Sequence, residues 1–274
     1  MKRTWTSVFS CILLMVTAVA WGAPVPGTGQ TVCYNDSAPI DCPAPGQAFY
    51  GQDKNYAINP MSYTKLDERG NVLDDSATSW SMVLDNVTGL VWEMKTHADG
   101  ARDYANPHDA DNIYFWYDGN ANTNGGDTGD QGTWDLTKPK GNTEEFVKAL
   151  NDGRFGGYSD WRMPTVEELA GIVNHENVAE GPARIDHRYF TDTVPGEFWT
   201  GTTVAGNPNI AWHVTFYDGA VQMAGKYAGV TSVKIPGNPR FISVTLAPTF
   251  PNRHVRAVRG GTSVRYTDNG NGAV

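Results

Sequence analysis

The sequence has little cysteine and comparatively little positive charge. Only three of its 274 residues are cysteine, and 21 Lys and Arg face 30 Asp and Glu, which gives a formal net charge of −9. Nucleic acids and anionic membranes both carry negative charge, so an acidic chain has no overall electrostatic attraction to either. The composition therefore argues against nucleic acid and against a charged membrane surface as partners.

Long apolar runs are also scarce. One run, residues 8–20, follows Lys2 and Arg3 and is too short to cross a bilayer. A positive start, a short apolar run and small residues near Ala20 are typical of a secretory signal peptide. We expect residues 1–22 to be removed on export to the periplasm, the cell surface or the medium. The mature chain would have no transmembrane segment and a formal net charge of −11, since two cations leave with the leader.

Common catalytic motifs are missing as well. The sequence contains no His-Glu-x-x-His zinc motif, no Gly-x-Ser-x-Gly nucleophile elbow and no Walker-type phosphate loop. Its six histidines are scattered along the chain, and its carboxylate pairs are those expected by chance in an acidic protein. We therefore predict no catalytic residues and a function other than that of an enzyme.

The two cysteines beyond the leader, Cys33 and Cys42, bracket the turn-rich stretch CYNDSAPIDC. In an oxidising compartment this spacing predicts a local disulfide, with two free thiols as the alternative. Residues 23–74 are therefore interpreted as a loop-rich N-terminal segment closed by that bridge. The main domain is expected over 75–261.

Local patterns predict an α+β fold for the main domain. Residues 79–94 indicate strand, turn and strand, and Asn142 is a suitable N-cap for a helix over 142–153. A second helix is expected to begin at Thr165 and to run through Val173, because Thr165 and Glu168 have the spacing of a capping box. Further strands are expected at 197–205, 210–219, 227–235, 240–247 and 254–260. Helices followed by antiparallel strands favour α+β over parallel βαβ units.

Residues 97–141 form a long polar insertion, which is either functional or fixed by other parts of the chain. Within it, oxygen-bearing side chains alternate before a glycine turn, as in short loops that wrap calcium. The predicted ligands are Asp118, Asn120, Asn122, Asn124 and Asp127. Neutral asparagines weaken the attraction for a divalent cation, so this would be a weak Ca²⁺ site. A merely solvated Asn/Gly loop is the alternative.

Two groups of residues are candidates for ligand contact. Arg253, Arg256 and Arg259 lie close together in the last predicted strand, and guanidinium groups bind sulfate and carboxylate bidentately. These arginines could instead pair with the chain's many carboxylates. Trp116 and Tyr117, in an aromatic stretch, could stack on sugar rings or pack in the core.

Six motifs occur together in one order: DNVTGLVWE, GGYSDWRMPTVEEL, IDHRYF, EFWTGTT, AWHVTFYDG and VRAVRGG. In this they resemble the bacterial domain family named after the C-terminal domain of the Legionella collagen-like adhesin. The resemblance covers residues 75–261. It implies a C-type-lectin-like fold, with two helices packed on twisted antiparallel sheets and long loops. It also implies an adhesin, since the name-giving member binds sulfated polysaccharides. Relatives often have a cysteine where this chain has glycines before Tyr158, so the core would lack that bridge.

The stretch SDWRMPTVEEL then has a structural interpretation. Asp160 and Arg162 are expected to form a buried or half-buried ion pair at the start of the helix. Trp161 would fill the core between the helices and the sheet, next to the capping box of Thr165 and Glu168.

Two functions remain open. The first is a secreted or surface-exposed, adhesin-like domain that binds carbohydrate or a surface protein. The second is a structural or assembly module of an exported multi-domain protein, in which the chain could form a homo-oligomer. Residues 262–274 resemble the lead-in to another strand–turn–strand unit, which favours the second function, or they are an ordinary tail.

Overall fold

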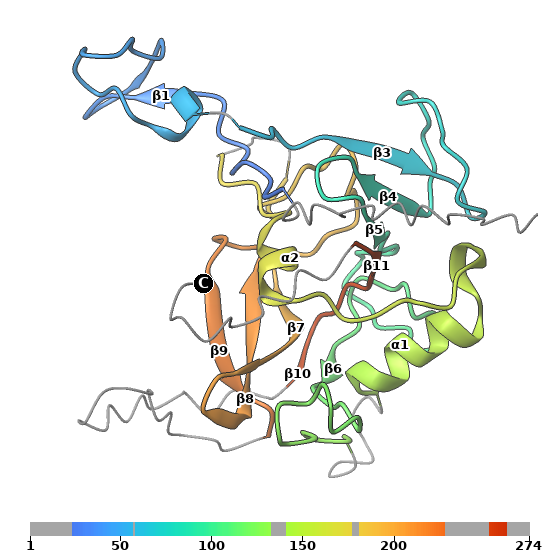
Figure 1. Ribbon diagram of the computed structural model, residues 1–274. Coiled ribbons are helices and arrows are strands. Elements are labelled where there is room, and N and C mark those ends of the chain that lie inside the picture. The colour runs from blue at the N-terminus through green and yellow to red at the C-terminus, as the bar shows by residue number, and fades with distance from the viewer. Residues whose placement is uncertain (1–23, 57, 133–140, 177–180, 228–251, 262–274) are drawn as a thin grey trace, which may run out of the picture.

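The computed structural model describes residues 24–56, 58–132, 141–176, 181–227 and 252–261 (Figure 1). The predicted leader and tail lie outside these residues. The strands are β1 Cys33–Tyr34, β2 Pro39–Ile40, β3 Tyr63–Leu66, β4 Met82–Asp85, β5 Leu90–Glu93, β6 Tyr114–Phe115, β7 Glu197–Val204, β8 Asn207–Thr215, β9 Val221–Gly225, β10 Asn252–Arg253 and β11 Val258–Gly260. The helices are α1 Thr143–Asp152 and α2 Val166–Ala170, with short 3-10 turns η1 Asp53–Tyr56 and η2 Phe155–Gly157. Every pair of named strands is antiparallel, which confirms the α+β class.

A four-stranded sheet has the order β11-β5-β4-β3. Its centre is the hairpin predicted over 79–94, in which the Asp85 carboxylate accepts from the backbone N–H of Val87 and from the hydroxyl of Thr88. Gly89 closes the turn at a φ of +73°, a conformation that favours glycine. β11 arrives from the far end of the chain and pairs with β5, with Val258 opposite Trp92.

A three-stranded sheet has the order β7-β8-β9. β7 and β8 were predicted, whereas β9, which pairs antiparallel with β8, was not. The strands predicted at 227–235 and 240–247 lie outside the described residues, apart from Tyr227. The predicted strand 254–260 contributes only β11, because β10 ends at Arg253 and the intervening residues run between the two sheets.

Both predicted helix starts are confirmed. The Asn142 side chain accepts from the backbone N–H of Glu145, and Thr165 and Glu168 form the reciprocal capping box of α2. α2 is shorter than predicted and ends at Ala170. Ile172 and Val173 are nevertheless fully buried, so the apolar pattern indicated core residues but not helix length.

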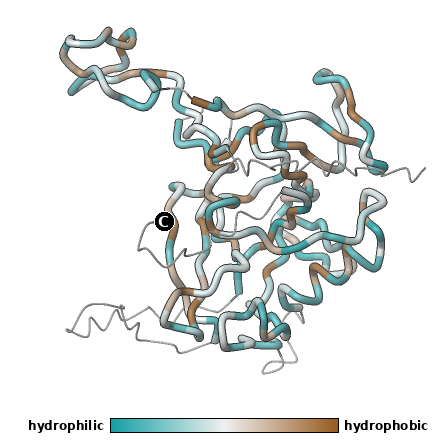
Figure 2. The backbone as a smooth tube through the Cα atoms, viewed as in Figure 1, coloured by the Kyte–Doolittle hydropathy of each residue, from teal (hydrophilic) through white to brown (hydrophobic). Residues whose placement is uncertain are grey.

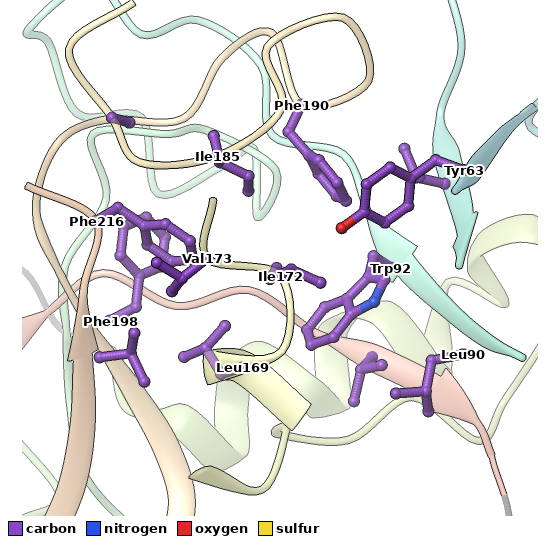
Figure 3. Packing of buried hydrophobic residues seen from close by; sticks show 14 of the residues in the cluster. Tyr63, Leu90, Trp92, Leu169, Ile172, Val173, Ile185, Phe190, Phe198 and Phe216 are labelled. Carbon is purple, nitrogen blue, oxygen red and sulfur yellow. The ribbon is translucent and has the colours of Figure 1, made fainter. Parts of the chain in front are cut away.

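Aromatic side chains fill the core (Figure 3). One cluster joins Trp92 of β5 to Leu169 of α2. It also contains Phe198 of β7 and Phe216, which follows β8. A second cluster contains Trp161, as predicted for the core, and its indole N–H donates to the Phe155 carbonyl at 2.9 Å. Hydrophobic residues recur along the strands, while the loops between them are largely hydrophilic (Figure 2).

Residues 24–56 and 58–62 form what we call the N-terminal module, which projects from the body with β1 and β2 (Figure 1). The predicted disulfide Cys33–Cys42 closes it. Two hydrogen bonds attach it to the body: His175 N–H donates to the Thr28 carbonyl at 2.8 Å, and Thr31 N–H donates to the Glu176 carboxylate at 2.9 Å. The module is thus fixed to the body at its base.

We expect acid to destabilise the fold through two histidines in or beside the three-stranded sheet: His213 of β8, and His254, which forms an isolated bridge with Phe198 of β7. Burial lowers the pKa of His213 to about 3, helped by the neighbouring Arg253, and burial lowers the pKa of His254 to about 4. The unfolded chain therefore binds more protons than the folded one from pH 6.5 down to about 4 for His254 and about 3 for His213. Stability is full above pH 6.5 and falls as the pH drops through that window. Each histidine contributes at most about 1.4 kcal/mol per pH unit.

Urea unfolding at several pH values checks this expectation. His213→Gln should reduce the acid-induced loss of unfolding free energy, whereas His97→Asn, at an exposed position, should leave the slope unchanged. Equal slopes for the unaltered chain and His213→Gln would contradict the assignment.

Candidate functional site

The three arginines predicted to meet a ligand are engaged with the protein itself. Arg256 is 0 % exposed and donates at 2.7 Å to the Glu93 carbonyl and to the Thr193 hydroxyl. Arg253 is 4 % exposed and pairs with Glu197, its Nε 2.7 Å from the carboxylate. The ligand-binding prediction is therefore wrong for both, because neither guanidinium reaches the surface.

Arg259 is less buried, but it too has partners. Its Nε donates to Asp160 at 2.8 Å, and its guanidinium lies 3.4 Å from the centre of the Tyr158 ring. The alternative interpretation, pairing with carboxylates, holds for this arginine as it does for Arg253.

The predicted aromatic contacts are likewise internal or partly so. Trp116 is 1 % exposed, and its indole N–H donates to the Thr200 carbonyl at 2.8 Å. It is a core residue, and the prediction that it meets a ligand is wrong. Tyr117 is half-buried, and its hydroxyl accepts from the side-chain amide of Gln131.

The predicted Asp160–Arg162 ion pair is not formed, because each residue has a different partner. The capping box folds the Glu168 carboxylate back to the start of α2, where it accepts from Thr165 N–H at 2.8 Å. There both of its oxygens also accept from Arg162, each at 2.7 Å. Asp160 is left to bind Arg259 of β11. The stretch thus joins the helix start to the C-terminal strand.

The predicted calcium loop satisfies most of its oxygens internally. Asp118, Asn120, Asn124 and Asp127 each accept from a backbone N–H two residues further on, as in Asx turns. Asp127 also accepts from the Tyr227 hydroxyl at 2.6 Å. Among the described residues, no group of three or more His, Cys, Asp or Glu side chains is placed to hold a metal ion. Calcium stays a prediction without support from these contacts.

An ammonium group is bound by this loop instead. Lys226 is 0 % exposed, and its Nζ donates at 2.8 Å to the carbonyls of Asn124 and Asp127. Nζ also lies 3.7 Å from the centre of the Trp116 ring, at cation–π distance. Burial lowers the pKa of Lys226 to about 8, while the carboxylates of Asp127 and Asp118 oppose that shift. The long insertion is therefore fixed by the chain itself at this end.

The other end of the insertion is fixed by a buried carboxylate that the sequence analysis missed. Glu93 accepts at 2.9 Å from Lys95 Nζ, from the imidazole of His108 and from Ala257 N–H. Burial alone would raise the pKa of Glu93, but Lys95 and His108 outweigh burial and lower it. An acid in the apolar run LVWEM was the available signal.

A cleft of about 460 Å³ opens between the N-terminal module and the body. Its lining has polar residues, among them Asp53, Glu176, Asp186 and Arg188, and apolar or aromatic ones, among them Tyr56, Ile58, Pro60 and Met61. Arg188 binds both oxygens of Asp186, at 3.0 and 2.6 Å, and Glu176 accepts from Thr31 N–H at 2.9 Å. None of these residues was singled out from the sequence, because the cleft joins segments more than a hundred residues apart.

Exposed large hydrophobic residues gather on the same module. Six of the nine found among the described residues lie there: Val25, Tyr34, Phe49, Tyr50, Tyr56 and Ile58. Elsewhere Val72, Tyr217 and Val221 are exposed. Clustered exposed apolar residues are typical of binding surfaces, whereas single ones are common on any protein.

The family follows from one comparison. The family model described as Lcl C-terminal domain matches residues 81–234. The chain belongs to this family. It is the family of the C-terminal domain of the Legionella collagen-like adhesin, an adhesin-associated domain that is not a known enzyme family. No curated protein and no solved structure matches the chain, so the C-type-lectin-like assignment stays a prediction.

The match places the candidate site at the border of the Lcl C-terminal domain. The matched range, residues 81–234, begins just before β4, ends beyond β9 and includes Glu176, Asp186 and Arg188 of the cleft. The N-terminal module precedes it, and β10 and β11 follow it although they pair with β6 and β5. Adhesin-related domains belong to surface or exported proteins. The described residues contain no helix long and apolar enough to span a membrane.

The buried ammonium of Lys226 should be essential for the folded conformation of the loop that contains Asn124 and Asp127. We expect Lys226→Met to lower the unfolding free energy by about 2 kcal/mol, because two buried carbonyls lose their donor while the ammonium's burial cost disappears. Urea unfolding measures the loss, and limited proteolysis should show new cleavage within 118–130. Lys148→Met, at an exposed lysine paired with Asp152, is the matched control and should change neither readout.

The buried carboxylate of Glu93 should contribute more to the unfolding free energy than the ammonium of Lys226 does. We expect Glu93→Gln to cost roughly 3 to 5 kcal/mol, because Lys95 would remain buried beside a neutral amide. The exposed substitution Glu145→Gln serves as control, since only the backbone N–H of that residue bonds to the cap. Near-equal urea midpoints for the two variants would refute a central role for Glu93.

Proposed function

We propose that the chain is a non-catalytic binding domain of an exported, adhesin-like protein and that it binds a carbohydrate in the cleft beside the N-terminal module. The observation that supports this proposal is the composition of the cleft. Its lining combines the carboxylate and guanidinium groups of Glu176, Asp186 and Arg188 with the exposed ring of Tyr56. Ligand sites of this kind combine an apolar surface with a few fixed polar groups that orient the ligand.

The polar groups of the cleft are held before any ligand arrives. Arg188 is bound by Asp186 in a two-point contact, and its side chain is still 70 % exposed. Glu176 accepts through one oxygen from Thr31, and its own N–H donates to Asn174 at 3.0 Å. Side chains fixed in this way lose little freedom on binding, which favours affinity. Hydroxyl pairs of a sugar are suitable partners for such planar groups.

The family supports a binding role more than a catalytic one, and the site itself must supply the specificity. The buried acid–base pair Glu93 and His108 does not line the cleft. The carboxylates of Glu176 and Asp186 in the cleft are hydrogen-bonded to Thr31 and Arg188. Because these bonds fix their orientation, the two groups are suited to position a ligand.

A glycan array on the chain from residue 23 onward tests the proposal. We expect binding that Arg188→Ala and Glu176→Gln each weaken at least tenfold in calorimetry, because the first removes a hydrogen-bonding side chain from the cleft and the second replaces a charged acceptor oxygen by an amide donor. Arg69→Ala, at an exposed arginine outside the cleft, is the matched control and should bind normally.

The rival function predicts a different pattern. An array without specific binding, together with self-association of the chain in analytical ultracentrifugation, would identify a structural or assembly module. Adding calcium during the array and the melting scan tests the metal separately, since a bound ion raises the melting temperature.

A further inference from the structure

The cleft continues onto the surface of the N-terminal module through one residue. Tyr56 lines the cleft and is 56 % exposed. Its ring centre lies 6.0 Å from that of Tyr50, with the ring planes tilted by 59°. Phe49, next to Tyr50 in the chain, is exposed too. Two neighbouring rings, of which Tyr56 lines the cleft, therefore extend the aromatic surface beyond it, and Phe49 exposes a third ring next to Tyr50 in the chain.

The backbone at Phe49 is strained, and burial does not offset that strain. Its φ is +65°, in the left-handed region that L-residues avoid because Cβ approaches the carbonyl oxygen. A glycine there would adopt this conformation freely. The phenyl ring is nevertheless 44 % exposed, so it gains little from packing. Strain at an exposed side chain is a reason to infer a functional role for it.

The rings are carried by a stiff frame. The Gln52 side-chain amide donates to the Tyr34 and Phe49 carbonyls at 2.6 and 2.9 Å and accepts from Tyr34 N–H at 2.8 Å. Asn55 accepts from Gly51 N–H and donates to the Pro43 carbonyl. Together with the Cys33–Cys42 bridge, these contacts hold the loop that bears Phe49 and Tyr50.

The charge of the module restricts the ligand. Residues 24–62 contain no arginine and one lysine, Lys54, against Asp36, Asp41 and Asp53. A sulfated polysaccharide or a nucleic acid would meet no cationic cluster here, although both could stack on the rings. A neutral sugar has no such requirement. When its substituents are equatorial, a pyranose has an apolar C–H face that fits an aromatic ring and a polar rim that fits hydroxyl, amide and carboxylate groups.

We propose that the cleft and the rings of Tyr56, Tyr50 and Phe49 form one extended site for a neutral oligosaccharide with equatorial substituents. One sugar unit occupies the cleft beside Arg188, and the following units lie along the rings. This inference rests on the proposed carbohydrate binding and adds the class of sugar, the direction of the chain and the role of the module.

Calorimetry with β-1,4-linked glucose and N-acetylglucosamine oligomers of two to six units tests the proposal, with a heparin hexasaccharide as the charged probe. For one of the neutral series we expect affinity to rise at least tenfold from the dimer to the hexamer, and heparin to bind more weakly. Tyr50→Ala and Phe49→Gly should abolish that rise while leaving dimer affinity unchanged. Tyr217→Ala, at a tyrosine that is 70 % exposed on the β8–β9 turn, is the matched control and should behave as the unaltered chain does.

Phe49→Gly separates binding from folding. Because glycine accepts the positive φ, this variant should melt at the same temperature as the unaltered chain or higher while it loses the length dependence. A lower melting temperature together with unchanged binding would assign Phe49 a structural role and overturn the inference.

The remaining outcomes are equally decisive. Length-independent binding of the neutral oligomers, or a rise that survives Tyr50→Ala, would overturn the extended site but leave the cleft as the binding site. Tighter binding of heparin than of any neutral hexamer would overturn the inferred class of sugar. Absence of binding to every one of these probes would overturn this inference, whereas the proposed carbohydrate binding would be overturned only if the glycan array also showed no specific binding.

Discussion

The buried carboxylate of Glu93 is the contact on which the arrangement of the body depends. It lies at the end of β5 and binds three partners from different parts of the chain: Lys95, His108 of the long insertion, and the backbone of Ala257 before β11. The Glu93 carbonyl also accepts from the fully buried Arg256. An ionised group in the interior is costly unless it is paired and hydrogen-bonded, so these segments must come together for the fold to form. The position of the insertion and the pairing of the last strand are thereby coupled.

Three buried lysines are likewise stabilised by hydrogen bonds to other parts of the chain. Lys65, Lys95 and Lys226 lie on a strand or just after one, and each donates to at least one backbone carbonyl of a loop. Each ammonium also lies within 4.5 Å of the centre of an aromatic ring, that of Trp80, Phe146 or Trp116. A lysine has three N–H donors on a flexible stem, which suits it to collect carbonyls from an irregular loop. Loops rich in Gly and Asp thus acquire fixed positions without secondary structure of their own.

Local signals predicted much of the fold, and non-local ones account for the errors. The hairpin around Gly89, the cap at Asn142 and the capping box at Thr165 depend on residues within a few positions of one another, so the sequence predicts them directly. The partners of Asp160 and Arg162 depend on where β11 lies, which no short window contains. The arginines illustrate the same limit, because basic residues in a row have the same spacing whether they face solvent or the core. Arg256 faces the core. The cleft could not be predicted at all, since it exists only where the N-terminal module meets Asn174, Glu176, Asp186 and Arg188.

The placement of charge also bears on the ligand. Five basic side chains, those of Lys65, Lys95, Lys226, Arg253 and Arg256, lie in the interior, where they fix loops and strands and cannot attract a polyanion. Four acidic side chains, those of Asp85, Glu93, Asp109 and Asp186, are buried as well, so the exposed groups keep the excess of acid over base that the composition indicates. Under the proposed function, this excess of acid favours ligands other than sulfated polysaccharides. The proposed site then obtains its specificity from groups that do not require positive charge. The exposed rings of the N-terminal module, which the family match does not include, are groups of that kind. A family domain that supplies one rigid wall and an attached segment that supplies the rings could change its ligand by altering the segment, without disturbing the buried charges on which the fold depends.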